Sequence, residues 1–241
     1  MRLPAKTTKA TPPGTAGATK PHRGGAEKAR EDVERVDFRK LSPQLYRASE
    51  VVTEVRVPRA TFLAVDGVGA PGGEAYQQAL EALFALAYTA KFTFKRAGLV
   101  DFVVPPLECL YFDDPESTPR DQWRWRLLLR IPDVASVAAL KEIRTAVAEG
   151  KGLDTTPVRR FAWAEGRALQ VLHVGPYDDV GDAFKQLAIE ADTRGLVCQP
   201  VAHEIYLSDP RRVAPEKLTT IVRVPVRPPR VEVQAVSFTM G

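Results

Sequence analysis

The sequence predicts an α+β fold in which two tandem β-α-β-β units, related by a pseudo-twofold axis, form antiparallel sheet with helices on one side and a central cleft. The first observation is an internal repeat, because PPLECLYFDDP at 105–115 matches PVAHEIYLSDP at 200–210. The identical positions lie 95 residues apart and pair Pro105, Tyr111, Asp114 and Pro115 with Pro200, Tyr206, Asp209 and Pro210. The second observation is that flanking segments recur in the same order: VDGVG at 65–69 matches VLHVG at 171–175, and Arg130 and Pro132 recur as Arg223 and Pro225. Matches in one order indicate a duplicated supersecondary unit.

The first unit begins with a strand over 61–66. The segment GGEAYQQALEALFALAYTAK at 72–91 follows and predicts a helix, because its apolar residues recur at helical spacing (Tyr76, Ala79, Leu80, Leu83, Leu86 and Ala87). Segments 107–112 and 123–131 are rich in apolar and aromatic residues and predict two strands that pair across DDPESTPRDQ.

A connecting helix is expected over 133–149, ending at Gly150. Segments 158–164 and 168–174 predict a hairpin that turns at Glu165-Gly166. A second helix over about 178–194 stops at Gly195, and strands follow at 201–207 and about 218–226. We therefore expect two helices on one face of the sheet, with the other face left free.

Composition limits the classes of protein that this chain can belong to. With 241 residues, 44% hydrophobic and 27% charged, it can form a sizeable core. There is no apolar run of about 18 residues, so we expect no membrane span, and no secretory signal is recognised at the N-terminus. The two cysteines, Cys109 and Cys198, cannot form a disulfide framework, which favours a reducing cytoplasm.

Positive charge is concentrated in the first 30 residues, which hold seven basic residues against one acidic residue. This segment is poor in large apolar side chains, so residues 1–34 are predicted to be a disordered, solvated tail that binds nucleic acid weakly at most. The predicted domain covers 35–227, with a first half at 55–132, a linker helix at 133–150 and a second half at 157–227. Residues 228–241 form a C-terminal extension.

Alternation along the strand at 201–207 predicts the surroundings of Glu204. Val201, His203, Ile205 and Leu207 suit the face that packs against the helices, and Ala202, Glu204 and Tyr206 suit the other face. The repeat places Leu107, Cys109 and Tyr111 at equivalent positions. We therefore expect a cleft lined by Tyr111, Tyr206, Cys109 and Glu204, with Trp123 and Trp125 as its largest apolar surfaces. A carboxylate among aromatic rings would have a raised pKa and would suit a general base or a counter-charge for a flat cation.

Structural explanations stay open for the same residues. A glutamate in a strand is often a solvent-facing residue on an open sheet, and the tryptophans and tyrosines could be core residues. His203 alone suggests a packed histidine. His173 ends a strand before Gly175-Pro176 and is a ligand-binding candidate, although a local backbone hydrogen bond would also explain it.

Three other types of site are not supported by the sequence. GVGAPG at 67–72 fits a dinucleotide-binding pattern, but no run of parallel strands follows it. Three scattered histidines do not support a Ser-His-Asp triad, and the zinc spacings CxxC and HExxH are absent. We expect no cofactor and no metal.

HEIYLSDPRR followed by PEKLTTIVRVPV, together with LQVLHVGPYDD, VDGVGAPG, LAYTAKF, VVPPLE and WRWRLLLRIPD, resembles the GyrI-like small-molecule-binding proteins over about residues 36–226. The resemblance implies an effector-binding-domain architecture with a central aromatic cleft. It also implies an important strand carboxylate at Glu204 and aromatic lining residues at Trp125, Tyr177 and Tyr206. A free-standing branch similar to this sequence is the cyclopropanoid cyclopropyl hydrolases, which open the strained ring of DNA-alkylating toxins with water.

Two functions follow from this resemblance. In an enzyme, Glu204 would accept a proton from the attacking water, and Tyr177 or Tyr206 would hydrogen-bond the oxygen where negative charge develops. In a binder or sensor, the same cleft would hold a flat aromatic or cationic drug without chemistry. Residues 1–34 are too short and too rich in proline and glycine for a helix-turn-helix, so a sensor would act with a separate regulator. The sequence specifies neither the ligand nor the oligomeric state.

Overall fold

The computed structural model describes residue 33 and residues 35–229. The predicted tail at 1–34 lies outside the described residues except for Val33, and so does the C-terminal extension from residue 230 onward. No helix in the part of the chain that the structure describes is long and apolar enough to cross a membrane.

Each predicted unit is present as strand, helix, strand and strand. The first consists of β3 (Ala60–Val68), α3 (Glu74–Arg96), β5 (Leu107–Tyr111) and β6 (Arg124–Arg130), and the second of β8 (Gly166–Val174), α5 (Gly181–Thr193), β10 (Ala202–Tyr206) and β11 (Thr219–Arg227). The other elements are β1 (Arg35–Val36), α1 (Phe38–Leu41), α2 (Pro43–Tyr46), β2 (Thr53–Val57), β4 (Asp101–Phe102), α4 (Val137–Lys151), β7 (Arg159–Trp163), β9 (Val197–Cys198) and the 3₁₀ helices η1 (Arg120–Gln122), η2 (Tyr177–Asp179) and η3 (Pro215–Lys217).

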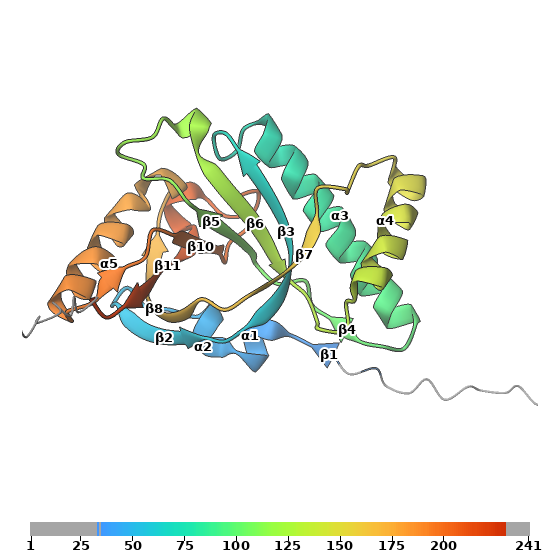
Figure 1. Ribbon diagram of the computed structural model, residues 1–241, viewed down its shortest axis with the longest axis horizontal. Coiled ribbons are helices and arrows are strands. Elements are labelled where there is room, and N and C mark those ends of the chain that lie inside the picture. Colours follow the sequence, from blue (N-terminus) through green and yellow to red (C-terminus); the bar gives the residue numbers. More distant parts are fainter. Residues whose placement is uncertain (1–32, 34, 230–241) are drawn as a thin grey trace, which may run out of the picture. The chain divides into compact units, whose positions relative to one another are not determined.

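One nine-stranded sheet joins the two units (Figure 1). Its order is β2-β8-β11-β10-β5-β6-β3-β7, with β9 added beside β11, and all of its pairs are antiparallel. In both units, the strand order from the outer part of the sheet to its centre is first, third and second strand. This order is β3, β6 and β5 in the first unit, and β8, β11 and β10 in the second. The two units meet where β5 pairs with β10. This arrangement is the one expected for a duplicated unit.

Helices α3 and α5 cover the same face of the sheet. Residue Glu204 lies opposite Cys109 on β5 and opposite Val222 on β11, so these three side chains share a face. Cys109 packs in the core that includes α3, and Val222 packs in the core under α5. Figure 1 shows the two helices on either side of the central strands β5 and β10.

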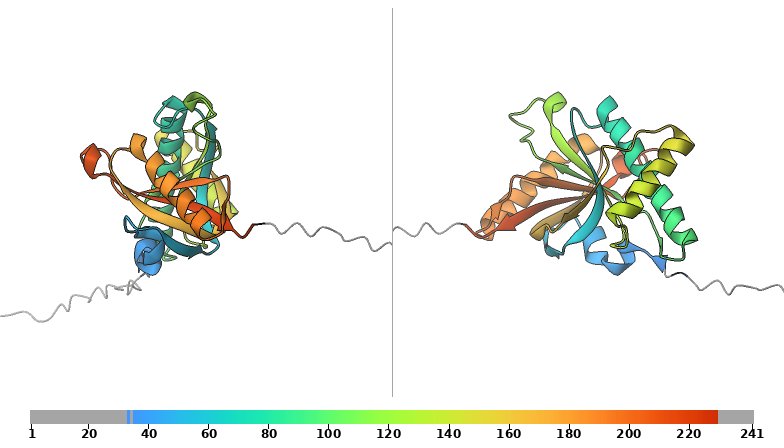
Figure 2. Two further views of the ribbon diagram at one scale, coloured as in Figure 1. Left: turned by 90° about the vertical axis from the view of Figure 1, so that its left-hand side faces the viewer. Right: turned by 45° about the vertical axis from the view of Figure 1, so that its right-hand side comes forward.

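The opposite face is covered, contrary to our expectation of a free face. At one end, Phe38, Leu45 and Tyr46 of α1 and α2 pack in one core with Ile205 and Ile221. At the other end, Phe62, Ala64, Leu110 and Leu128 form a separate core with Phe161 and Trp163 of β7 partly buried against it. Figure 2 shows α1 and α2, in blue, beside β2. The short N-terminal helices escaped prediction because four-residue segments carry almost no periodicity.

The predicted hairpin at Glu165-Gly166 is wrong. Strand β7 pairs with β3, and β8 pairs with β2 and β11, so two residues connect strands at different ends of the sheet. Gly166 has φ 79°, which lets the chain turn sharply at this point. The sheet is therefore strongly curved, and Trp163 of β7 reaches His203 of β10, with ring centroids 5.5 Å apart.

Candidate functional site

The centre of the sheet brings repeat-equivalent residues together. Cys109 and Glu204 are 95 positions apart in the repeat and are also direct partners across the β5–β10 pair. Tyr111 and Tyr206 have the same offset, and their hydroxyl oxygens lie 3.0 Å apart. The two units therefore meet at these pairs, and the candidate site forms where they meet.

Glu204 occupies the middle of β10 and is 7% exposed. Burial raises the pKa of its carboxyl to about 7, and the neighbouring Tyr206 hydroxyl and the positive charges of His203 and Arg120 offset only part of this effect. The carboxyl therefore exchanges its proton near neutral pH, which is the range where a general base is effective.

Neutral hydroxyl and thiol groups surround this carboxyl. Burial raises the pKa of the Tyr76, Tyr111 and Tyr206 hydroxyls far above their usual range, and the charge of Glu204 acts in the same direction. Burial likewise raises the pKa of the Cys109 thiol. At neutral pH the tyrosines are therefore hydrogen-bond donors, and Cys109 is a thiol rather than a nucleophilic thiolate.

A cleft of about 1800 Å³ opens above Glu204, between α3 and α5. Its aromatic lining comes from both units and consists of Tyr76, Phe84, Tyr88, Tyr111, Phe112, Trp123, Tyr177, Phe184 and Tyr206. Tyr177 meets Tyr206 edge to face at 5.2 Å, and Tyr111 meets Trp123 in the same way at 5.8 Å. Such a volume and lining fit a drug-sized aromatic ligand.

An ion pair joins the two units where the cleft is lined by η1 and η2. Arg120 of η1 donates from Nη1 to Asp178 Oδ1 of η2 at 2.9 Å, and its guanidinium lies 5.7 Å from the Trp123 ring centroid. Both side chains are more than half exposed. The pair contributes little free energy in water and can therefore open readily.

The structure reverses the predicted faces. The alternation grouped the residues correctly, but Glu204 and Tyr206 lie on the helix-covered face, whereas His203 and Ile205 lie on the opposite one. Both faces of β10 are largely buried, so alternation alone could not show which of them the helices cover.

The predicted site residues fall into two groups. Five of them line the cleft, namely Glu204, Tyr177, Tyr206, Tyr111 and Trp123. Cys109 lies fully buried beside Glu204. Trp125 is 1% exposed and packs edge to face against Tyr76 at 5.1 Å, so it supports the cleft wall from behind. His173 directs Nε2 to the Pro176 carbonyl oxygen at 2.9 Å and is not part of the lining.

Tyr76, Arg120 and Asp178 also belong to the site but were not predicted from the sequence. Tyr76 belongs to the residues at helical spacing that predict its helix, so its hydroxyl was not considered, although a buried tyrosine hydroxyl needs a polar partner. Arg120 and Asp178 lie in the short 3₁₀ helices η1 and η2, 58 positions apart in the sequence, and only the fold brings them into contact.

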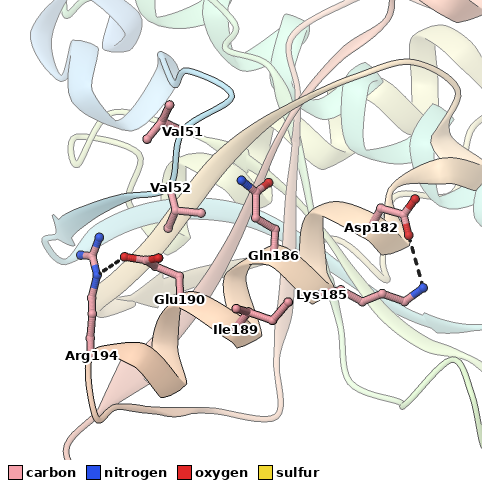
Figure 3. A pocket seen from close by; sticks show the side chains of 8 residues that line it. All are labelled: Val51, Val52, Asp182, Lys185, Gln186, Ile189, Glu190 and Arg194. Carbon is pink, nitrogen blue, oxygen red and sulfur yellow. Dashed lines mark hydrogen bonds and ion pairs between the residues drawn. The ribbon is translucent and has the colours of Figure 1, made fainter.

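A second, smaller hollow lies on the outer side of α5, next to Val51 and Val52 (Figure 3). Its charged side chains pair with each other: Lys185 with Asp182 at 3.2 Å, and Arg194 with Glu190 at 2.7 Å. Glu204 and its tyrosines lie outside this hollow, so the cleft between α3 and α5 is the candidate site.

Comparison with known proteins agrees with this architecture. Residues 51–227 match the model of the GyrI-like small molecule binding domain. Three crystal structures from Listeria innocua are similar over their full length and cover 80% of this chain. Two are described as hydrolases, with 35% and 37% sequence identity and TM-scores of 0.75 and 0.73. The third is described as an uncharacterized conserved protein, with 36% identity and a TM-score of 0.76.

The search of curated proteins gave no match. The family model spans both units, and the residues that line the cleft come from both. This chain therefore belongs to the GyrI-like small molecule binding domain family.

Proposed function

We propose that this protein hydrolyses the cyclopropane ring of flat, DNA-alkylating-type toxins, with Glu204 as the general base. The observation that carries the proposal is a buried carboxyl with a pKa of about 7 beside a large aromatic cleft. The hydrolase descriptions of two relatives with 35% and 37% identity support a hydrolytic reaction.

The aromatic lining would bind the toxin. A planar ring system can stack between side chains such as Trp123, Tyr177 and Phe84, which line the cleft. A nucleobase that stacks on an aromatic side chain gains about 1–3 kcal/mol, and a planar toxin ring would stack in the same way. The strained ring would then lie next to Glu204, where solvent is largely excluded.

The reaction needs one base and one donor. Ionised Glu204 removes a proton from a water molecule while the water oxygen bonds to the CH₂ carbon of the cyclopropane. The bond between this CH₂ carbon and the cyclopropane carbon that belongs to the conjugated ring breaks, and its electron pair moves through the conjugated ring to the carbonyl oxygen, which becomes a phenol oxygen. Tyr206 or Tyr177 donates a hydrogen bond to this oxygen, and both hydroxyls are protonated at neutral pH because burial raises the pKa of each. The proton held by Glu204 returns to solvent or to the phenolate, so atoms and charge balance.

An alternative is a non-catalytic binder or sensor of flat cationic drugs, acting with a separate regulator. The favouring observation is that acidic side chains outnumber basic ones along the cleft. The acidic ones are Glu74, Glu81, Asp113, Asp114, Glu116, Asp178, Glu204 and Asp209, and the basic ones are Arg39, Arg120, Lys185 and Arg211. Such a lining attracts cations.

The deciding experiment is turnover of a cyclopropane-containing alkylator in water enriched in ¹⁸O, followed by mass spectrometry. Hydrolysis adds one water to the compound and places the label in the product. The Glu204→Gln variant keeps the size of the side chain but cannot accept the proton, so its rate should fall at least about 100-fold while affinity changes little.

An unchanged compound that is nevertheless bound would contradict hydrolysis and support the binder. In that case Glu204→Gln should weaken a planar cationic dye but not a neutral analogue of the same shape. The matched control is Glu54→Gln on β2. This variant also replaces a carboxylate by an amide, but Glu54 pairs with Arg167 and lies outside the cleft.

A further inference from the structure

A buried charge cluster lies on the face of the sheet opposite Glu204. It consists of Glu108, Glu165, His203 and Arg223, which come from β5, the β7–β8 connection, β10 and β11. Their exposed fractions are 4%, 6%, 1% and 2%. None of the four lines the cleft, and the proposed hydrolysis does not use them.

Both ring nitrogens of His203 face carboxylates. Nε2 lies 3.1 Å from Glu108 Oε2, and Nδ1 lies 3.0 Å from Glu165 Oε2. A neutral imidazole has one N–H donor and one lone pair, so one contact would set a lone pair against a carboxylate oxygen. An imidazolium has an N–H on each ring nitrogen and can donate to both carboxylates, so both contacts are then hydrogen bonds.

A proton on one of the carboxyls would be the other solution, but the remaining contacts disfavour it. The Tyr46 hydroxyl of α2 donates to Glu108 Oε1 at 3.1 Å, and Arg223 Nη1 donates to Glu165 Oε2 at 3.3 Å. A proton on the buried Glu165 Oε1 would have no acceptor, because this atom has no hydrogen-bond partner among the described residues. Glu165 is therefore placed as an anion, because His203 and Arg223 beside it hold the pKa of this buried carboxyl below its usual range, and the Tyr46 hydroxyl donates to Glu108 as it would to a carboxylate.

The cluster is balanced when His203 is charged, with two anions against an imidazolium and a guanidinium. Balance matters because an uncompensated buried charge is costly. Arg223 is held further by Gln170 Oε1, at 2.8 Å from Nη2, and by the Leu45 carbonyl oxygen at 2.7 Å. Burial lowers the pKa of His203, but Glu165 and Glu108 outweigh this effect, so that its pKa is raised overall.

We infer that His203 is a permanently protonated positioning residue, which holds a positive charge behind Glu204 and favours the ionised form of that carboxyl. The two residues are neighbours on β10 and point to opposite faces of the sheet. On its own face, Glu204 meets the uncharged Cys109 of β5, Tyr76 of α3 and Tyr206.

The other cation that acts on Glu204, Arg120, is half exposed and paired with Asp178, so water and salt weaken its effect. His203 is instead sealed from solvent. The catalytic consequence rests on the proposed function of Glu204, but the charge state of His203 does not.

The first test observes His203 in the unaltered full-length protein. Two-bond ¹H–¹⁵N spectra distinguish an imidazolium from either neutral tautomer. We expect the imidazolium pattern for His203 at pH 7.5, with the signals assigned by comparison with His173→Gln and His203→Gln. A neutral tautomer at this pH would overturn the inference.

The second test follows the Glu204 carboxyl by ¹³C NMR, assigned with Glu204→Gln. In His203→Gln the titration midpoint should move upward from about 7 by roughly half a pH unit or more. The matched control is His173→Gln, whose ring contacts an uncharged carbonyl, and it should leave the midpoint unchanged. An unchanged midpoint in folded His203→Gln would contradict the inference.

Neither test measures turnover, so the two proposals can fail separately. If hydrolysis is absent but both NMR results hold, the proposed function fails and the role of His203 remains. If hydrolysis depends on Glu204 and the midpoint does not move, His203 is a structural residue only.

Discussion

The hydroxyl oxygens of Tyr111 and Tyr206 lie 3.0 Å apart across the junction of the two units. The two residues are equivalent in the internal repeat, so one side chain from each unit approaches the same point. Beside them Cys109 and Glu204, also equivalent, carry different chemistry. Each unit thus supplies one tyrosine hydroxyl, and the second unit alone supplies the ionisable carboxyl of Glu204.

The tyrosine pair should show strong energetic coupling. Tyr111→Phe or Tyr206→Phe alone leaves a buried hydroxyl without its partner, which should cost about 1–2 kcal/mol of unfolding free energy. The double variant should cost less than the sum of the single ones, with a coupling of about 1 kcal/mol in urea unfolding. Strictly additive losses would show that the two hydroxyls do not interact.

Glu204 should reduce stability at high pH. Because its folded pKa is raised from 4.5 to about 7, its contribution to stability is fully present below 4.5 and is lost as the pH rises through 7. Glu204→Gln should therefore increase the unfolding free energy at about pH 8, on the order of 2–3 kcal/mol, and so raise the melting temperature. At about pH 4 the substitution should change the stability little. An equal effect at both pH values would contradict a buried, ionising carboxyl.

The same pKa predicts a pH profile for turnover. The base acts when ionised, so activity should rise as the pH increases through about 7 and then level off. Together with the stability measurement, this profile would show that the group which activates the reaction also destabilises the fold.

Gly67 should be intolerant of substitution. It lies opposite Trp125 in the β3–β6 pair, and a Cβ at this position would overlap the indole ring. Gly67→Ala should cost at least about 1–3 kcal/mol of unfolding free energy through overpacking. The control is Gly150→Ala in α4, where a Cβ meets no atom within 4 Å and helix propensity favours alanine. Equal stability of the two variants would contradict the packing of Trp125.

The ion pair between Arg120 and Asp178 should slow ligand exchange. Asp178→Asn removes a contact that spans the two units, so association and dissociation rates should both rise, by up to about fivefold for a pair worth at most about 1 kcal/mol. Stopped-flow fluorescence with a planar dye measures both rates, with Glu54→Gln as the control. High salt should reduce the difference. Identical rates for Asp178→Asn and the control would exclude a gating role.

The sequence by itself predicted the two strand-helix-strand-strand units and the partners of Glu204. An offset of 95 already paired Tyr111 with Tyr206 and Cys109 with Glu204, and strand alternation placed Glu204 and Tyr206 on one face. These relationships are local or periodic, so they can be read along the chain. A glutamate within an apolar strand, together with the family resemblance, directed attention to the candidate site.

Only the tertiary structure decided which face the helices cover, where Trp125 lies and what surrounds His203. Both faces of β10 are buried, so alternation could not separate them. Trp125 and Trp123 share a parity, yet Trp123 lines the cleft, whereas Trp125 fills the space left by the missing side chain of Gly67. The charge cluster around His203 joins four segments across a curved sheet, and contacts at such separations depend on packing that no local pattern encodes.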